Sequence, residues 1–269
     1  MANRQGDFIW YELMTTDPEG AKAFYDAVAG WDIDAESATP GDMDYRMIKR
    51  SDGGFAGGML ALSEDMRAGG ARPAWLGYVH VADVDEAVAA IERNGGATRM
   101  PATTMEGVGR MAMVADPQGA PIYVMAPTPP ADDAEATSDV FSVDRPGHVR
   151  WNELATCDAE AATAFYTSQF GWTQEGGMEM GAMGRYRFLM QNGTGIGAIM
   201  PKPEAMPVSA WTYYIGVDDI DRARQAVEEG GGRVISGPHE IPGGEFSLSG
   251  ADPQSAAFGL VGPRKQGQA

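Results

Sequence analysis

The sequence predicts an α+β fold of two tandem domains, each built from a pair of β-α-β-β-β units. The first observation is a repeat, because Trp10-Tyr11-Glu12-Leu13 recurs as Trp151-Asn152-Glu153-Leu154 at an offset of 151 − 10 = 141 residues. The same offset carries Gly30-Trp31 onto Gly171-Trp172. The second observation is a fainter repeat inside the first half, where residues 75–96 follow the pattern of residues 8–30. Repetition at both levels indicates a tandem duplication with two units in each half.

The first unit begins with a strand at Phe8–Met14, which is dense in apolar and aromatic residues. Side chains alternate along a strand, so one face carries Trp10, Glu12 and Met14. Asp17 is suited to cap the helix that follows, and Pro18 is suited to its first position. The apolar stripe of this helix consists of Ala21, Phe24, Tyr25 and Val28. Short extended runs between residues 31 and 62 predict three further strands.

The second unit repeats this plan with a strand at residues 75–81 and a helix capped by Asp83. Strands at residues 110–114 and 121–125 close the unit around the turn Asp116-Pro117-Gln118-Gly119. In the second half, the corresponding elements are predicted at residues 149–156, 158–170, 186–190, 195–200, 211–217, 219–229 and 258–261. The turn Asp252-Pro253-Gln254-Ser255 precedes the last of these strands.

Residues 128–146 are predicted to form an exposed linker between the domains. This stretch is rich in proline, alanine and acidic residues, and its apolar residues follow no period. The two domains are therefore expected at residues 1–127 and 147–269.

The charge and cysteine content exclude several classes of partner and compartment. With 20 basic and 38 acidic side chains the formal net charge is −18, so nucleic acid and anionic membrane surfaces would be repelled. Cys157 is the single cysteine, which rules out an intramolecular disulfide. No stretch approaches the roughly 18 apolar residues of a membrane span, and no apolar signal core opens the chain. A cytoplasmic location is the expectation.

Four β-α-β-β-β units resemble the vicinal oxygen chelate superfamily, which includes glyoxalases, bleomycin-resistance proteins and extradiol dioxygenases. The resemblance is carried by the Phe-Tyr pairs on the first helix of each half, by the Asp-Pro-Gln turns and by the repeated Trp-x-Glu-Leu. It covers nearly the whole chain outside the linker and looks like the tandem glyoxalase-like branch. It implies that each domain forms a curved sheet, a cup whose concave side holds a ligand.

Metal-binding members of this superfamily carry ligands at positions that can be counted from the helix cap and the Asp-Pro turn. The resemblance places these positions in the first domain at Trp10, Leu76 and Tyr123. In the second domain it places them at Trp151, Thr212 and Gly259. None of these residues is a normal ligand of a divalent metal, which needs imidazole or carboxylate groups. We therefore expect no metal and no cofactor.

If the register follows the family, the first cup receives Trp10, Glu12, Met14, Leu76, Tyr78, His80 and Tyr123. The second cup receives Trp151, Glu153, Thr212 and Tyr214. An aromatic wall with a carboxylate is typical of a small-molecule pocket. Several methionines, including Met178, Met180 and Met183, either line such a pocket or fill the core. The aromatic residues likewise fit ligand stacking or simple core packing.

Glu12 and Glu153 are the candidate catalytic residues. Aromatic neighbours can raise the pKa of a carboxyl group, which would make either residue a general base beside a carbonyl. The alternative is a structural carboxylate that hydrogen-bonds the backbone or a nearby arginine, such as Arg46 or Arg187. No other residue replaces the metal as an electrophile, which favours the structural alternative.

The chain has three histidines, His80, His148 and His239. His80 is placed to pair with Glu12 as an acid-base couple, although a single histidine on a strand also fits a structural hydrogen bond. His148 is expected to be exposed beside the linker. His239 is expected in a loop, where it and Glu245 are candidates for adventitious ion binding.

Three hypotheses of function follow. The first is a metal-free protein that binds a small, mostly apolar organic molecule in its cups. The second is a metal-independent lyase or isomerase of glyoxalase type, acting on a 2-oxoaldehyde or its thiol adduct with Glu12 or Glu153 as base. The third is a non-catalytic structural or interaction protein. Four units can supply two cups within one chain, so a monomer and a homodimer are both compatible with the sequence.

Overall fold

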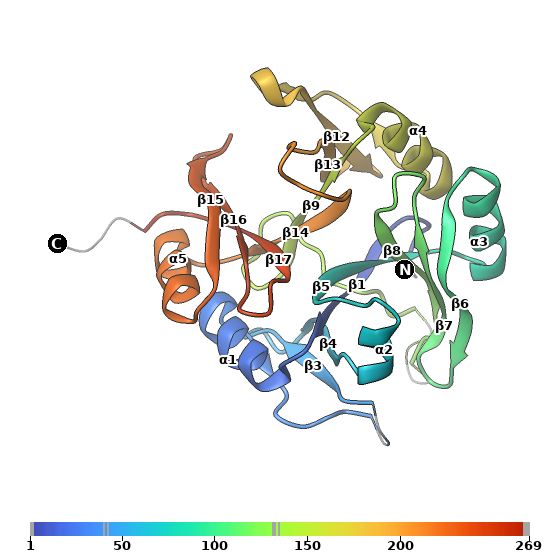
Figure 1. The fold of residues 1–269 in the computed structure, drawn as a ribbon, viewed down its shortest axis with the longest axis horizontal. Helices are drawn as coiled ribbons and strands as arrows, with labels where there is room; N and C mark the ends of the chain where they lie inside the picture. Colours follow the sequence, from blue (N-terminus) through green and yellow to red (C-terminus); the bar gives the residue numbers. More distant parts are fainter. Residues whose placement is uncertain (1–2, 40, 42, 131–132, 134, 266–269) are drawn as a thin grey trace. The chain divides into compact units, whose positions relative to one another are not determined.

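The computed structural model describes residues 3–39, 41, 43–130, 133 and 135–265, and it confirms the predicted fold class. The first half of the chain (Figure 1) contains β1 (Phe8–Thr15), α1 (Pro18–Ala29), β2 (Asp32–Ile33), β3 (Tyr45–Lys49), β4 (Phe55–Ala61), α2 (Glu64–Ala68), β5 (Ala74–His80), α3 (Val84–Arg93), β6 (Ala97–Met105), β7 (Gly109–Ala115) and β8 (Pro121–Pro127). The short helix α2 was not predicted, although Ser63 caps it by accepting from the Met66 amide at 3.2 Å.

The second half repeats this order. It contains β9 (Val149–Thr156), α4 (Ala159–Phe170), β10 (Thr173–Gln174), β11 (Met178–Glu179), the 3-10 turn η1 (Gly181–Met183), β12 (Arg185–Gln191), β13 (Thr194–Pro201), β14 (Ala210–Gly216), α5 (Ile220–Glu229), β15 (Arg233–Glu240), β16 (Phe246–Ala251) and β17 (Ala257–Gly262). The strand order is β2-β3-β4-β1-β5-β8-β7-β6 in the first sheet and β10-β12-β13-β9-β14-β17-β16-β15 in the second, and both sheets are open.

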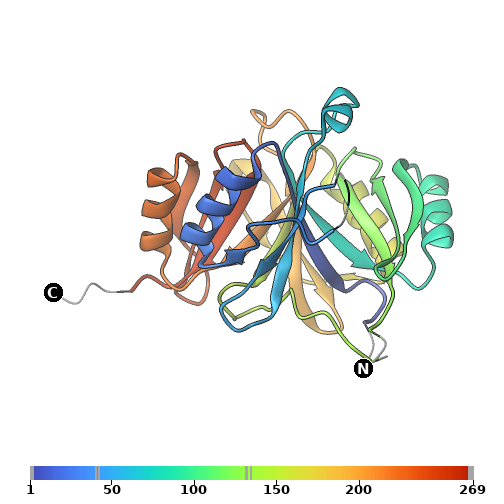
Figure 2. The same cartoon turned by 90° about the horizontal axis from the view of Figure 1, so that it is seen from below.

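The chain forms two compact units that cut across the two sequence repeats. Unit 1 comprises residues 1–9, 76–138 and 151–212, and unit 2 comprises residues 10–75, 139–150 and 213–269. Within unit 1 helices α3 and α4 are in contact, and within unit 2 helices α1 and α5 are in contact, as Figure 2 shows for the blue and orange pair. Each unit therefore combines one β-α-β-β-β module from each repeat. The predicted domain limits remain a prediction.

The repeated Gly-Trp motif turns the chain from a helix into the core of each unit. Gly171 ends α4 in the left-handed conformation (φ 71°), which suits a residue without a Cβ atom. Trp172 follows directly, is 2% exposed and donates its indole N–H to the Gly6 carbonyl at 2.8 Å. In unit 2, Gly30 (φ 70°) and Trp31 repeat the arrangement, and the Trp31 indole donates to the Gly147 carbonyl at 2.8 Å.

A buried hydrogen-bond relay explains the Phe-Tyr and Asp-Pro-Gln motifs. In unit 2 the Trp75 indole donates to the Tyr25 hydroxyl at 2.8 Å, and this hydroxyl bonds to Asp252 Oδ2 at 3.1 Å. In unit 1 the Trp211 indole donates to the Tyr166 hydroxyl at 3.0 Å, and Tyr166 is hydrogen-bonded to Asp116. Burial raises the pKa of both aspartates. The two motifs thus connect modules that belong to different repeats.

Part of the segment predicted as an exposed linker is packed within unit 2. Val140 is 2% exposed, and the Arg50 guanidinium pairs with Asp139 at 2.6 Å. His148 was predicted to be exposed, but it is fully buried, because the segment that carries it is packed within unit 2. Its Nδ1 lies 3.0 Å from the Pro146 carbonyl. That prediction was wrong. Residues 131, 132 and 134 of the predicted linker lie outside the described residues.

No helix in the described part of the chain combines the length and the apolar character that a membrane crossing requires.

Candidate functional site

A hydrogen-bond relay in unit 1 forms the centre of the candidate site. The Trp151 indole donates to the Tyr186 hydroxyl at 2.7 Å, and this hydroxyl donates to Glu153 Oε2 at 2.7 Å. Trp151 and Glu153 lie two residues apart on β9, so both point to the same face of the sheet. Each side chain in the relay is therefore held in place by at least one of the others.

The register of the neighbouring strands explains why these side chains meet. Glu153 on β9 is opposite Ala198 on β13, and Ala198 is opposite Phe188 on β12. The three residues thus share one row and one face of the sheet. Ala198 is fully buried, so the larger side chains around it cover it. Tyr186 lies two residues before Phe188 and projects to this same face.

Apolar side chains surround the relay. Its cluster contains the buried residues Ala155, Tyr186, Ala198 and Met200, and packed against them are the half-buried residues Trp151, Met178, Met180, Phe188 and Met206. The Phe188 ring stands nearly perpendicular to both Trp151 (82°, centroids 6.1 Å apart) and Tyr186 (80°, 5.9 Å). The half-buried members expose an aromatic and methionine surface next to a carboxylate, which is the usual composition of a small-molecule site.

Unit 2 contains the corresponding residues of the first repeat. The Trp10 indole donates to the Tyr45 hydroxyl at 2.8 Å, and Glu12 is 3% exposed. Glu12 is opposite Gly58, and Gly58 is opposite Met47. A Cβ atom on Gly58 would lie 2.1 Å from the Tyr45 hydroxyl oxygen, so Tyr45 packs directly on this glycine. Glu12 is therefore more deeply buried than Glu153, and a methionine stands where the second repeat has Phe188.

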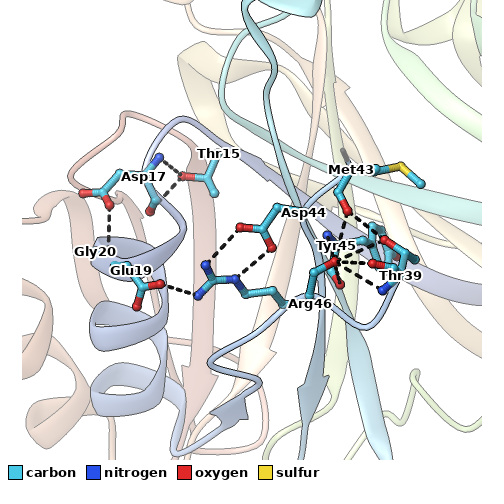
Figure 3. Close-up of polar contacts among 10 residues, drawn as sticks. Thr15, Asp17, Glu19, Gly20, Thr39, Met43, Asp44, Tyr45 and Arg46 are labelled. Carbon is cyan, nitrogen blue, oxygen red and sulfur yellow. Dashed lines mark hydrogen bonds and ion pairs between the residues drawn. The ribbon is translucent and has the colours of Figure 1, made fainter. Parts of the chain in front are cut away.

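Arg46, which the sequence suggested as a partner of Glu12, forms its hydrogen bonds and ion pair with Asp44 and Glu19. Arg46 binds Asp44 through two hydrogen bonds of 3.0 Å, and it pairs with Glu19 of α1 at 2.7 Å (Figure 3). The hydrogen bonds that Arg46 donates, first to Asp44 and then to Glu19, raise the pKa of Arg46. Arg46 follows Tyr45 on β3 and projects to the opposite face, so it fastens α1 to the strand. For Glu153, the structure identifies the Tyr186 hydroxyl as a partner.

Aromatic packing occupies four of the six positions at which the resemblance predicts metal ligands. The indole N–H groups of Trp10 and Trp151 are donors and are bound to tyrosine hydroxyls. Tyr123 lies flat on Tyr78, with centroids 4.1 Å apart and planes at 9°. Gly259 offers no side chain, and a Cβ atom there would be 2.4 Å from the Tyr214 ring.

The remaining two positions are no better suited to a metal. They hold Leu76, which is 2% exposed, and Thr212. Within the described ranges there is also no group of three or more His, Cys, Asp or Glu side chains that could hold a metal ion. The residues at the family's ligand positions do not fit a divalent metal, which requires imidazole or carboxylate donors.

The predicted site residues are divided between the two units. Unit 1 contains Tyr78, His80, Tyr123, Trp151, Glu153 and Thr212, and unit 2 contains Trp10, Glu12, Met14 and Tyr214. The structure brings together Trp151 with Glu153 through Tyr186, and Tyr78 with Tyr123. Glu12 and His80, which were predicted to form an acid-base pair, belong to different units, so this pair stays a prediction.

Sequence reasoning missed several residues of this site and misplaced one histidine. Tyr45 and Tyr186 were omitted although the repeat carries both at 35 residues after a tryptophan, and Phe188 carried no repeat signal because the first copy has Met47. His239 was predicted in a loop, but it lies in β15 with its Nε2 3.0 Å from the Ser236 hydroxyl. Glu245, its suggested partner, instead pairs with Arg150 at 2.7 Å.

The fold and the repeated site define the class of protein. The family model of the Glyoxalase/Bleomycin resistance protein/Dioxygenase superfamily matches residues 8–124 and 145–254, so the chain belongs to this superfamily. The predicted resemblance is confirmed.

Individual relatives extend over most of the chain. "Putative glyoxylase CFP32" of Mycobacterium tuberculosis (strain CDC 1551 / Oshkosh) is 33% identical over 264 residues, covering 98% of this chain and 97% of that protein. "Anthracycline biosynthesis protein DauV" of Streptomyces sp. (strain C5) is 27% identical over 270 residues, covering 94% and 91%. The solved structure of the Mn(II)-bound glyoxalase from Novosphingobium aromaticivorans superposes with a TM-score of 0.62 at 17% identity, covering 96% of this chain and 82% of that one. This last similarity is one of fold.

Proposed function

We propose that this glyoxalase-like protein binds a small, mostly apolar organic molecule without a metal, at the site formed by Trp151, Tyr186 and Glu153. The observation that carries the proposal is the relay of these three residues beneath a half-buried surface of aromatic and methionine side chains. Stacking on Trp151 and Phe188 would hold the apolar body of the ligand. The adaptable methionines would fit its outline.

A metal-independent lyase or isomerase with Glu12 or Glu153 as base is the second candidate. The repeated carboxylate beside a tryptophan favours it, because both copies retain this group. Against it stands the Tyr186 hydroxyl, which donates to Glu153 Oε2 and so already occupies one acceptor site of the carboxylate that would have to act as the base. Binding therefore ranks first.

Replacing Trp151 by alanine is expected to abolish most of the ligand affinity of the protein. A screen of apolar aromatic compounds, including anthracyclines, by thermal shift would identify ligands that raise the melting temperature. Their Kd, measured by titration calorimetry, should rise at least about tenfold in Trp151→Ala, since large aromatic contacts each contribute more than about 1 kcal/mol to binding.

The control is Trp10→Ala, which deletes the same side chain in the first repeat and should leave this affinity unchanged. If no compound in a diverse screen binds, or if Trp10→Ala weakens binding and Trp151→Ala does not, the proposal is wrong. Consumption of methylglyoxal with glutathione that is lost in Glu153→Gln or Glu12→Gln would instead favour the catalytic candidate.

A further inference from the structure

A groove in unit 1 is lined by residues that take no part in the Trp151 site. Helix α3 supplies most of its wall, and the segment before β1 and the last turn of α4 complete it through Gln5 and Gln169. Helices α3 and α4 are in contact and lie side by side in Figure 1. The groove has a volume of about 590 Å³, which is within the usual range for a small-molecule site.

In unit 2 the corresponding place is occupied by the guanidinium group of Arg222. The offset that relates β5 to β14 is 211 − 75 = 136 residues, and it carries Glu86 of α3 onto Arg222 of α5. Arg222 donates to the carbonyls of Ala27 and Val28 at 2.8 and 3.1 Å, and both carbonyls belong to the last turn of α1. Arg222 is also paired with Asp218 at 2.9 Å. Helix-end carbonyls and a carboxylate therefore hold this cation.

Unit 1 has the same helix end but an acidic residue in place of the arginine. At the offset of 141 residues, the two acceptor carbonyls correspond to those of Ser168 and Gln169 in the last turn of α4. Carbonyls at the C-terminal end of a helix carry a partial negative charge and are stabilised by cations. Glu86 lines the groove from α3 and adds a full negative charge. A guanidinium supplied from outside would therefore meet the same kinds of acceptor that hold Arg222 in unit 2.

Two further differences between the units account for the groove. Gly230, directly after α5, packs against the Phe24 ring of α1, because a Cβ atom on this glycine would lie 2.9 Å from that ring. The counterpart of Gly230 in unit 1 is Asn94, whose Cβ atom excludes the same close approach. Asp218 is replaced by Ala82, which lines the groove. At these positions, unit 1 therefore lacks the groups that bring the two helices together in unit 2.

A basic residue lines the groove two helical turns from Glu86. Arg93 follows Glu86 by seven residues on α3, so both project from the same side of the helix, about 10 Å apart. The small residues Ala87 and Ala90 line the groove as well. Among the described residues, none forms a hydrogen bond or ion pair with the Glu86 carboxylate or the Arg93 guanidinium. The groove thus has an acidic end and a basic end with small apolar side chains between them.

We propose that this groove is a second small-molecule site, which binds a compound with a guanidinium group at one end and a carboxylate at the other. The guanidinium lies between Glu86 and the last turn of α4, where unit 2 has Arg222. The aliphatic chain of the ligand lies along Ala87 and Ala90, and its carboxylate pairs with Arg93. This site is separate from the binding function proposed above, and neither depends on the other.

Three probes that share a short aliphatic chain test the site. 4-Guanidinobutanoate carries both charges, 4-ureidobutanoate has a neutral group in place of the guanidinium, and butylguanidine lacks the carboxylate. In titrations of the full-length ¹⁵N-labelled protein followed by NMR, the amide signals of Ala87, Ala90 and Gln169 should shift. The Kd of 4-guanidinobutanoate is expected to be about tenfold below that of either other probe. This probe has no net charge, so the long-range attraction of cations by the net charge of −18 does not explain its binding.

Charge-removing variants assign the two ends of the ligand. Glu86→Gln is expected to raise the Kd of 4-guanidinobutanoate about tenfold, because the guanidinium loses its carboxylate partner. Glu160→Gln is the matched control, since Glu160 is likewise an exposed acidic residue in the first turn of its helix, and this variant should leave the Kd unchanged. Arg93→Gln should weaken binding of 4-guanidinobutanoate and leave binding of butylguanidine nearly unchanged.

Glu86→Arg installs the residue that unit 2 carries at this position. Its guanidinium is expected to bind the carbonyls of Ser168 and Gln169 as Arg222 binds those of α1. The variant should therefore lose binding of 4-guanidinobutanoate and melt about 1 to 2 °C higher than the unchanged protein. This increase in the melting temperature is a readout that does not depend on any ligand.

Three results would overturn the proposal. The first is the absence of amide shifts along α3 at about 10 mM 4-guanidinobutanoate, which is far above the Kd of a specific site. The second is equal binding of 4-guanidinobutanoate and 4-ureidobutanoate. The third is unchanged binding in both Glu86→Gln and Glu86→Arg, because the guanidinium would then bind elsewhere. The amide spectrum of each variant establishes that the fold is retained.

Discussion

Trp172→Ala is expected to lower the free energy of unfolding by about 4 kcal/mol, in the range of buried tryptophan truncations. Trp172 contacts four aromatic rings of unit 1, with centroids 5.1 to 6.2 Å away, belonging to Phe8, Tyr166, Phe170 and Trp211. The substitution leaves a cavity among these rings and removes the donor to the Gly6 carbonyl. The change is measured by urea unfolding followed by circular dichroism.

Trp151→Ala is the matched control for this experiment. It removes the same side chain from a half-buried position of the same unit, so it should cost clearly less than Trp172→Ala. Equal losses for the two variants would show that Trp172 is not the centre of the unit 1 core.

Tyr25→Phe is expected to lower the free energy of unfolding by about 3 kcal/mol, because it leaves two buried polar partners without their shared hydroxyl. The Trp75 indole loses its acceptor, and Asp252 loses a donor. Burial raises the pKa of Tyr25 well above its usual value, so the hydroxyl stays protonated and available as a donor. Combining Tyr25→Phe with Asp252→Asn in a double-mutant cycle measures their coupling, expected at about 1 to 2 kcal/mol.

The burial of Asp252 makes stability depend on pH. Because burial raises the pKa of Asp252, the folded protein binds this proton more tightly than the unfolded chain does. The contribution to stability is therefore fully present below pH 3.8 and is lost as the pH rises through the folded pKa. Asp252→Asn should flatten this part of the pH profile. A coupling near zero would contradict the relay, and an unchanged pH profile would contradict the raised pKa of Asp252.

Local features of the fold could be predicted from the sequence. Asp17 and Asp83 each accept a backbone N–H at 3.0 Å as helix caps, and their roles depend only on residues within the first turn. The alternation that placed Trp151 and Glu153 on one face likewise depends on neighbouring residues. Helix caps and strand alternation can be predicted because the residues that determine them lie close together in the sequence.

The pairing of modules could not be predicted. Tyr25 bonds Asp252 at a separation of 227 residues, and nothing in either motif specifies which repeat supplies its partner. The burial of His148 likewise depends on residues that are distant in the sequence. The ion pair between Arg50 and Asp139 holds the segment that precedes His148. At the candidate site, Phe188 was missed because its role follows from register with Ala198 and Glu153, and strand register is a property of the folded sheet.

The metal content of the purified protein tests most directly the central claim. This claim is that the protein binds its ligand without a metal, because aromatic packing occupies the positions at which the resemblance predicts metal ligands. Trp10, Trp151 and Tyr123 stand at ligand positions and are engaged by Tyr45, Tyr186 and Tyr78. After incubation with zinc, nickel, manganese or iron(II) and removal of free ions, elemental analysis should find well below 0.1 metal per chain, as a rough upper limit for adventitious binding. One tightly bound ion per domain, retained after gel filtration, would contradict the account.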